Sequence, residues 1–329
     1  MRHIKYLVIS LVVLSLVALF TKQSEGWGFW GHKRINRIAV FTLPPQMLTL
    51  FKENIEYITE HAVDPDKRRY SSPDEAPRHY IDIDRYGIYP NYDLPRKWRD
   101  AVMKYSEDTL KAHGIVPWHI QNMMFRLKEA FEKKNKSRIL QTAAELGHYV
   151  ADAHVPLHCT RNYNGQLTGQ NGIHAFWESR IPELFGDNYD YFVGKATYID
   201  NTEEFIWKFV MESASQADSV LSIERDLSKQ FSDDKKYSFE QRGNAMVRVY
   251  SAEFSDAYAK ALNNMIERKM RKSILNLGSI WYTCWVNAGS PDLQNLKYTE
   301  PTPEEIAEMN ALENSWKGGK MLGRDHEDH

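Results

Sequence analysis

The chain has little cysteine and almost no net charge. Two cysteines in 329 residues are too few for a disulfide-stapled scaffold or for a zinc module built from thiolates. The 42 Lys and Arg residues nearly balance the 44 Asp and Glu residues, which gives a net charge of −2. Such a chain lacks the basic field with which proteins hold duplex DNA through many phosphates. The 42% hydrophobic and 26% charged residues exclude a globally disordered protein.

Long apolar runs are scarce as well, and the N-terminus carries the main one. Residues 7–20 form an apolar stretch of about fourteen residues, whereas a bilayer span needs roughly twenty. Basic residues precede this stretch, and the small residues Ser24 and Gly26 follow it. This order is typical of a signal peptide over residues 1–26, whose removal makes Trp27 the N-terminus. An uncleaved anchor is the alternative. We expect an exported protein, secreted or periplasmic, with no integral membrane segment after cleavage.

Strand-like alternation is nearly absent, and a helical period dominates the rest of the chain. We expect an all-α fold, a single compact multi-helix domain over residues 27–290. Residues 60–92 and 159–173 are rich in Pro, Gly, Asn and Asp and are predicted to be loops. Residues 291–329 are predicted to form a charged and loose tail. The predicted helices cover residues 31–42, 45–54, 96–113, 118–133, 136–153, 174–182, 202–225, 237–270 and 272–286.

Histidines and carboxylates cluster in the segment ELGHYVADAHVPLH, residues 145–158. His148 and Asp152 are four residues apart in a helical pattern, so their side chains share one face. Pro156 ends that helix and allows His158 to turn back toward it. His154 has the same spacing to His158, but Pro156 breaks the helical geometry between them, so His154 is left out of the ligand set. Imidazole and carboxylate groups are good ligands for zinc.

A second pair with the same spacing follows in GIHAFWES. His174 and Glu178 lie on a short predicted helix, and no HExxH motif of the zinc proteases occurs here. A single pair of this kind is common on protein surfaces. Two such pairs within about thirty residues, with His158 between them, indicate a metal site.

Further candidate ligands lie upstream. His79 follows Asp64 and Asp66, although Asp-Pro-Asp is also ordinary turn chemistry. His32 lies five residues after Trp27, whose free amino group and carbonyl oxygen can chelate a metal once the leader is removed.

These segments together resemble the trinuclear zinc phosphodiesterases, which comprise bacterial zinc-dependent phospholipases C and single-strand-specific nucleases. The resemblance rests on WGFWGH, HYIDID, HYVADAHVPLH and GIHAFWE, which follow the family's order over residues 27–178. It implies the all-α fold of that family and three Zn²⁺ ions. Zinc lowers the pKa of bound water to about 7 and neutralises phosphoryl oxygens, so the implied reaction is hydrolysis of a phosphoric ester. The implied ligand sets are Asp66, His79, His148 and Asp152 for the first ion, His158, His174 and Glu178 for the second, and Trp27, His32 and a bridging Asp152 for the third.

The resemblance also suggests catalytic roles near the first ion. Asp64 and Asp66 fit the spacing to His79 equally well, but Arg69 follows Asp66 as an arginine follows the aspartate of the nucleases, so Asp66 is preferred. Asp66 is expected to orient or deprotonate the water. Arg69, or its neighbour Arg68, is expected to stabilise charge on the phosphate.

The substrate class stays open at this point. The short interval from His158 to His174 and the Glu at position 178 resemble the phospholipases, whereas the spacing from Trp27 to His32 resembles the nucleases. A phospholipase C acting on phospholipid head groups is the first hypothesis, and a nuclease or 3′-nucleotidase acting on single-stranded nucleic acid is the second. A non-catalytic zinc protein is the third. No protein partner is implied.

Two smaller points remain open in the sequence. Tyr80 is a candidate for stacking on a nucleobase, with an ordinary buried tyrosine as the alternative. Cys159 and Cys284 are interpreted as structural, and the sequence alone does not determine whether they pair.

Overall fold

The computed structural model describes residues 28–242, 245–294, 296, 303–318 and 321–322. Helices dominate this part of the chain, which confirms the predicted all-α class, and the two small sheets that it contains have two strands each. None of the described helices is both long and apolar enough to cross a membrane. The signal peptide predicted over residues 1–26 and the predicted ligand Trp27 lie outside the described residues.

The elements follow one another as listed here. The α-helices are α2 (Gly28–Ala39), α3 (Pro45–Glu53), α4 (Ile55–Glu60), α5 (Asp64–Arg68), α6 (Trp98–Tyr105), α7 (Glu107–Ala112), α8 (Val116–Glu132), α9 (Lys136–Asp152), α10 (Ile173–Ala175), α11 (Ile181–Phe185), α12 (Thr202–Ala214), α13 (Ala217–Ser228), α14 (Asp233–Lys236), α15 (Ala252–Ala261), α16 (Met265–Asn287) and α17 (Pro303–Gly318). Short 3₁₀ turns are η1 (Val40–Thr42), η2 (His61–Val63), η3 (Ala76–Arg78), η4 (Ile83–Arg85), η5 (Pro156–Cys159) and η7 (Gly186–Asn188), and η6 (Phe176–Arg180) is a turn of π-helix. The strands are β1 (Gly87–Ile88), β2 (Asn91–Tyr92), β3 (Tyr237–Arg242) and β4 (Ala245–Tyr250).

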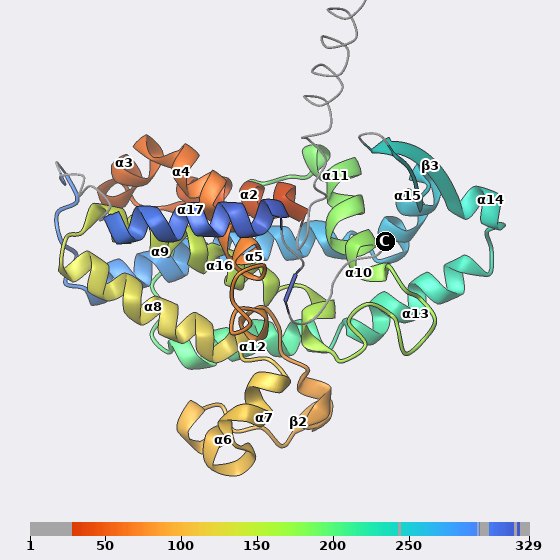
Figure 1. Ribbon diagram of the computed structural model, residues 1–329, viewed down its shortest axis with the longest axis horizontal. Coiled ribbons are helices and arrows are strands. Elements are labelled where there is room, and N and C mark those ends of the chain that lie inside the picture. The colour runs from red at the N-terminus through yellow and green to blue at the C-terminus, as the bar shows by residue number, and fades with distance from the viewer. Residues whose placement is uncertain (1–27, 243–244, 295, 297–302, 319–320, 323–329) are drawn as a thin grey trace, which may run out of the picture.

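The core is a bundle in which α16 packs against α2, α8 and α9 (Figure 1). The apolar residues of α8 recur at helical spacing, so Met123, Leu127 and Phe131 face the interior together. Asn135 precedes helix α9, and its side chain accepts a hydrogen bond from the amide of Arg138; the second half of the helix is buried throughout.

A glycine allows helices α2 and α9 to approach closely. A Cβ at Gly147 of α9 would lie 1.9 Å from the side-chain oxygen of Asn36 in α2. Asn36 donates hydrogen bonds to the carbonyl oxygens of Ile58 and Ala144. The lack of a side chain at position 147 therefore brings α2 and α9 together where each carries a predicted metal ligand.

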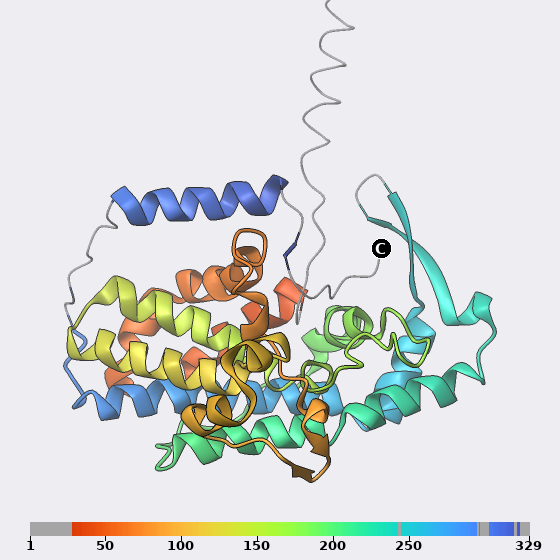
Figure 2. The same cartoon turned by 60° about the horizontal axis from the view of Figure 1, so that its bottom comes forward.

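The helix predicted over residues 237–270 is wrong in its first half. Residues 237–242 and 245–250 form the two strands of the hairpin β3–β4, in which Tyr237 pairs with Tyr250 and Arg242 with Ala245. Phe239, Val247 and Val249 favour strands, and the intervening Gly-Asn dipeptide is a known two-residue hairpin connection. Figure 2 shows this hairpin projecting from the end of the molecule at which α14 and α15 lie.

Other predicted helices are broken or joined differently. The helix expected over 96–113 is split by Ser106, whose positive φ of 67° ends α6 and whose side chain caps α7. The helix expected over 202–225 becomes α12 and α13. Helix α16 runs through the break expected near residue 271.

The C-terminal region differs from the loose tail that the sequence suggested. Residues 303–318 form α17, which lies against α5. Trp316 lies 5.9 Å from the ring of Phe29, and the amide of Leu322 donates to the carbonyl oxygen of Arg69 at 2.8 Å. The buried core also includes Leu293.

Candidate metal centre

All of the predicted ligands other than Trp27 come together in the interior, although they arise from separate elements. Each of them is at most 2% exposed. The side chains belong to α2 (His32), α5 (Asp66), the residue after η3 (His79), α9 (His148 and Asp152), η5 (His158), α10 (His174) and η6 (Glu178).

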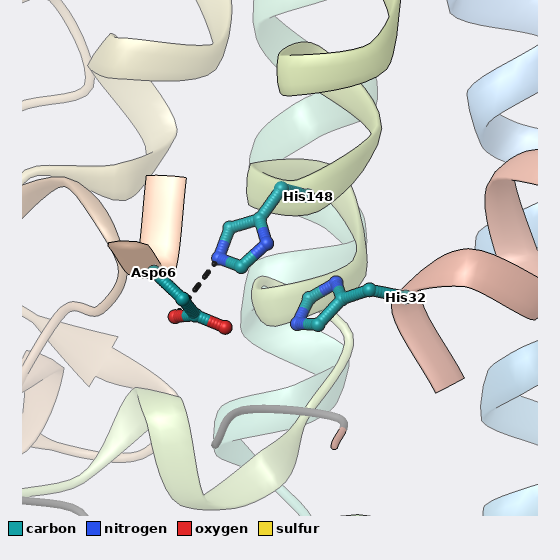
Figure 3. Close-up of side chains that lie close together, drawn as sticks. All are labelled: His32, Asp66 and His148. Atoms are coloured by element: carbon teal, nitrogen blue, oxygen red, sulfur yellow. Dashed lines mark ion pairs between the residues drawn. The ribbon is translucent and has the colours of Figure 1, made fainter. Parts of the chain in front are cut away.

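His32, Asp66 and His148 form one group that could hold a metal ion (Figure 3). The rings of His32 and His148 are stacked with centroids 3.9 Å apart, and Nε2 of His148 lies 3.4 Å from Oδ1 of Asp66. The donors come from α2, α5 and α9, so the tertiary contact between these helices assembles the group.

Asp152 connects the histidines of the centre. Its Oδ2 lies 3.0 Å from Nδ1 of His79 and 3.3 Å from Nε2 of His148, and its Oδ1 lies 3.4 Å from Nε2 of His32. His79, His148 and Asp152 thus form a second group with metal-ligand spacing. A carboxylate whose two oxygens face different imidazoles is suited to bridging two ions.

His158, His174 and Glu178 form the third group. Oε2 of Glu178 lies 2.9 Å from Nε2 of His174 and 3.3 Å from Nε2 of His158. The turn of π-helix that carries Glu178 follows directly after α10, and π-turns are frequent at functional sites.

In two of these histidines, the ring nitrogen Nδ1 contacts a backbone carbonyl oxygen. Nδ1 of His148 lies 2.9 Å from the carbonyl oxygen of Ala62, and Nδ1 of His158 lies 2.7 Å from that of His79. Such contacts place the proton on Nδ1, so that the lone pair of Nε2 is directed toward the other predicted ligands, which is the usual arrangement around bound zinc.

Glu75 plays the corresponding role for His79, and the sequence analysis missed it. Its Oε1 lies 3.4 Å from Nε2 of His79 and accepts a hydrogen bond from the hydroxyl of Tyr149. Its Oε2 lies 3.3 Å from Nε of Arg68 and 2.6 Å from Nη1 of Arg78. Glu75 is four residues before His79, so the same spacing that revealed the two ligand pairs was present here too.

The charges in the centre favour ionised carboxylates. Burial acts to raise the pKa of Asp152 and to lower that of His148, but the attraction between the two outweighs it. The pKa of Asp152 is therefore held well below, and that of His148 well above, its ordinary value. Burial, with the nearby His148, lowers the pKa of His32. Negative charge is thus available to neutralise cations.

The polar atoms of the centre fit a metal. Oδ2 of Asp66 and Nδ1 of His32 are buried and have no hydrogen-bond partner in the part of the chain that the structure describes. Burying such atoms without a partner is costly, and a bound cation removes that cost for the carboxylate. Neutral imidazoles and carboxylates are the donor set that zinc prefers in proteins.

Asp66, rather than Asp64, occupies the cluster. Asp64 contacts His61 at 2.5 Å and Lys67 at 3.3 Å, away from the predicted ligands. Arg68 contacts a different carboxylate: its Nη1 and Nη2 form bidentate hydrogen bonds to Glu145 at 3.0 and 2.9 Å. Arg69 follows α5 and is buried, with 1% exposure.

Tyr80 is 6% exposed, and its ring packs where a Cβ on Gly114 would lie. This burial favours the core interpretation over base stacking.

His154 lies outside the three groups: its Nδ1 contacts the carbonyl oxygen of Val150, and its Nε2 contacts Asn276. Cys159 and Cys284 are buried thiols rather than a disulfide pair.

Comparisons with known proteins identify the family of the chain. A family model described as S1/P1 nuclease matches residues 27–283, a span that contains every predicted ligand. The chain belongs to the S1/P1 nuclease family. The resemblance in the sequence is therefore confirmed, and this family member is a zinc-dependent phosphodiesterase.

More distant similarities exist among solved structures, while a search of curated proteins gave no match. Clostridium perfringens alpha-toxin from an avian strain aligns with a TM-score of 0.45 at 16% identity, and the alpha-toxin of Clostridium absonum with 0.46 at 11%. Each alignment covers 80% of this chain and 65% of the toxin. Similarity at this level says nothing about activity.

Proposed function

We propose that this S1/P1 family member is an exported nuclease that hydrolyses phosphodiester bonds in single-stranded nucleic acid and releases phosphate from 3′-nucleotides. The observation that carries the proposal is the family match over residues 27–283, which includes the entire metal centre. Export rests on the leader-like composition of residues 1–26.

The ligand sets stated above for three zinc ions are part of this proposal. Zinc bound by these residues supplies Lewis acidity to phosphate oxygens and to water. Asp66 would contribute to the first set and would also orient or deprotonate the attacking water. Arg69, on the turn after Asp66, contributes positive charge that stabilises the phosphate in the transition state.

A phospholipase C, which the sequence analysis placed first, becomes the second candidate, and the short interval from His158 to His174 and the Glu at position 178 still favour it. In the structure these three residues do form one compact group. The same ions and the same water chemistry would serve both reactions, so the substrate pocket decides between them.

A parallel turnover assay tests the proposal. Zinc-loaded protein beginning at Trp27 is offered single-stranded DNA, 3′-AMP and phosphatidylcholine vesicles, each with and without a chelator, and His148→Ala serves as the inactive control. We expect chelator-sensitive cleavage of DNA and release of phosphate from 3′-AMP. Release of phosphocholine without nucleic acid cleavage would establish the phospholipase instead. No turnover on any substrate by zinc-loaded protein would support a non-catalytic role.

A further inference from the structure

The hairpin β3–β4 projects from the helical body (Figure 2), and it carries exposed apolar side chains. Six residues in each strand correspond to a length of roughly 20 Å. Phe239 is 67% exposed and Met246 is 64% exposed. Large apolar side chains that are exposed together on a projecting element are typical of a surface that binds a ligand or a partner molecule.

The base of the hairpin is fixed to the turn that carries a predicted metal ligand. Arg180, in η6, makes a two-pronged contact with the carboxylate of Glu240 and donates to the carbonyl oxygen of Tyr250 at 3.3 Å. The ring of Phe176, also in η6, stacks on Tyr250 with centroids 3.8 Å apart. Glu178 lies between Phe176 and Arg180. The hairpin is thus attached directly to the wall of the metal centre.

The exposed face combines aromatic and cationic groups. Phe239 pairs across the strands with Arg248, and Gln241 pairs with Met246. Since cross-strand partners lie on one face, these four side chains form a continuous surface, which we call the hairpin face. The guanidinium of Arg248 lies 3.6 Å above the ring centroid of Tyr237, which covers one of its faces, and Arg248 is an exposed residue.

This chemistry fits a single-stranded nucleic acid better than a lipid surface. A planar guanidinium and a phenyl ring side by side can stack on successive bases, and the N–H edge of arginine can bind a phosphate. The net charge of the chain is −2, so the local positive charge of Arg248 is what can attract a phosphate to this surface. Arg248 and Gln241 interrupt the apolar surface between Phe239 and Met246, which disfavours insertion into a bilayer.

We propose that the hairpin face binds the single strand beyond the scissile phosphate and so extends the substrate site of the metal centre. This inference rests on the proposed nuclease function. The hairpin face contacts a polynucleotide and not a mononucleotide, because it lies outside the cluster of metal ligands. It therefore determines the preference for long strands over small substrates.

The double variant Phe239→Ala/Arg248→Gln tests the proposal, since it leaves the contacts of Arg180 and Phe176 with the hairpin base intact. We expect KM for a long oligothymidylate to rise about 10-fold, the loss expected for a stacked base. Both kcat on that strand and kcat/KM on 3′-AMP should stay unchanged. Phe192→Ala is the matched control, because Phe192 is 87% exposed and lies outside the hairpin.

An unchanged KM for the oligothymidylate overturns the proposal. An equal loss on both substrates also overturns it, because it means that the metal centre itself is damaged. Fluorescence anisotropy of the zinc-loaded protein with a non-hydrolysable oligothymidylate analogue measures strand binding without turnover, and the double variant should bind this analogue about 10-fold more weakly. If wild-type protein cleaves no nucleic acid, the proposed function fails, while this binding measurement still decides the hairpin. If the double variant loses binding to phosphatidylcholine vesicles but still binds the oligothymidylate as the wild type does, the assignment is contradicted and the hairpin is a lipid contact.

Discussion

Replacing Glu75 with Gln tests whether a buried carboxylate positions the metal ligand His79. The variant keeps the size of the side chain but removes the negative charge that faces Nε2 of His79 at 3.4 Å. Carboxylates that contact a ligating histidine typically contribute 10- to 100-fold to metal affinity. We therefore expect Glu75→Gln to weaken zinc binding about 10- to 100-fold, measured by competition with a chelator, and to lower activity at limiting zinc.

The same substitution also affects stability, so a matched control is needed. Oε2 of Glu75 accepts from Arg68 and Arg78 and Oε1 accepts from Tyr149, and the amide of Gln, which has only one oxygen, cannot accept all three bonds. The loss of buried hydrogen bonds to charged groups costs about 1.5–3 kcal/mol. Glu145→Gln removes another carboxylate partner of Arg68 without contacting His79. Equal zinc affinities in the two variants would refute the positioning role.

Three further predictions follow from the same structure. His148→Ala should reduce the zinc content and abolish hydrolysis while helicity by circular dichroism is kept; full activity with unchanged zinc would disprove the site. Gly278→Ala places a Cβ 1.9 Å from Oγ1 of Thr42, and should lower the free energy of unfolding by about 1–3 kcal/mol, less so when combined with Thr42→Ala. Burial lowers the pKa of Lys269 to about 8 despite the nearby Glu212. The charged form of Lys269 therefore destabilises the fold below about pH 8, and this penalty is lost as the pH rises from there toward the pKa of lysine in the unfolded chain. Between pH 7 and 9.5 the wild type should therefore gain about 2 kcal/mol of stability relative to Lys269→Met, and equal pH dependence would contradict this.

The metal ligands could be predicted because local geometry and chemistry agree in them. His148 and Asp152 lie one helical turn apart, as do His174 and Glu178 in the following segment, so spacing alone places each pair on one face. The choice between Asp64 and Asp66 is different. Both fit the spacing, and only the packing of α5 against η2 and α9 decides which one is buried among the histidines.

Tertiary contacts explain what the sequence did not reveal. The function of Glu75 depends on Tyr149, seventy-four positions away along the chain, and on the arginines around it. The strands β3 and β4 lie in a segment that the sequence analysis assigned to a helix. The Gly-Asn dipeptide at positions 243–244 of the sequence and the β-branched Val247 and Val249 were the signals that favoured strands. Helix α17 is stabilised against α5, a contact that no local pattern predicts.

Anomalous diffraction at the zinc absorption edge, from crystals of the zinc-loaded chain that begins at Trp27, tests the metal centre most directly. The account predicts three peaks: one among Asp66, His79, His148 and Asp152, one among His158, His174 and Glu178, and one beside His32 and Trp27. Peaks confined to other parts of the molecule, or no peak within these groups, would contradict it.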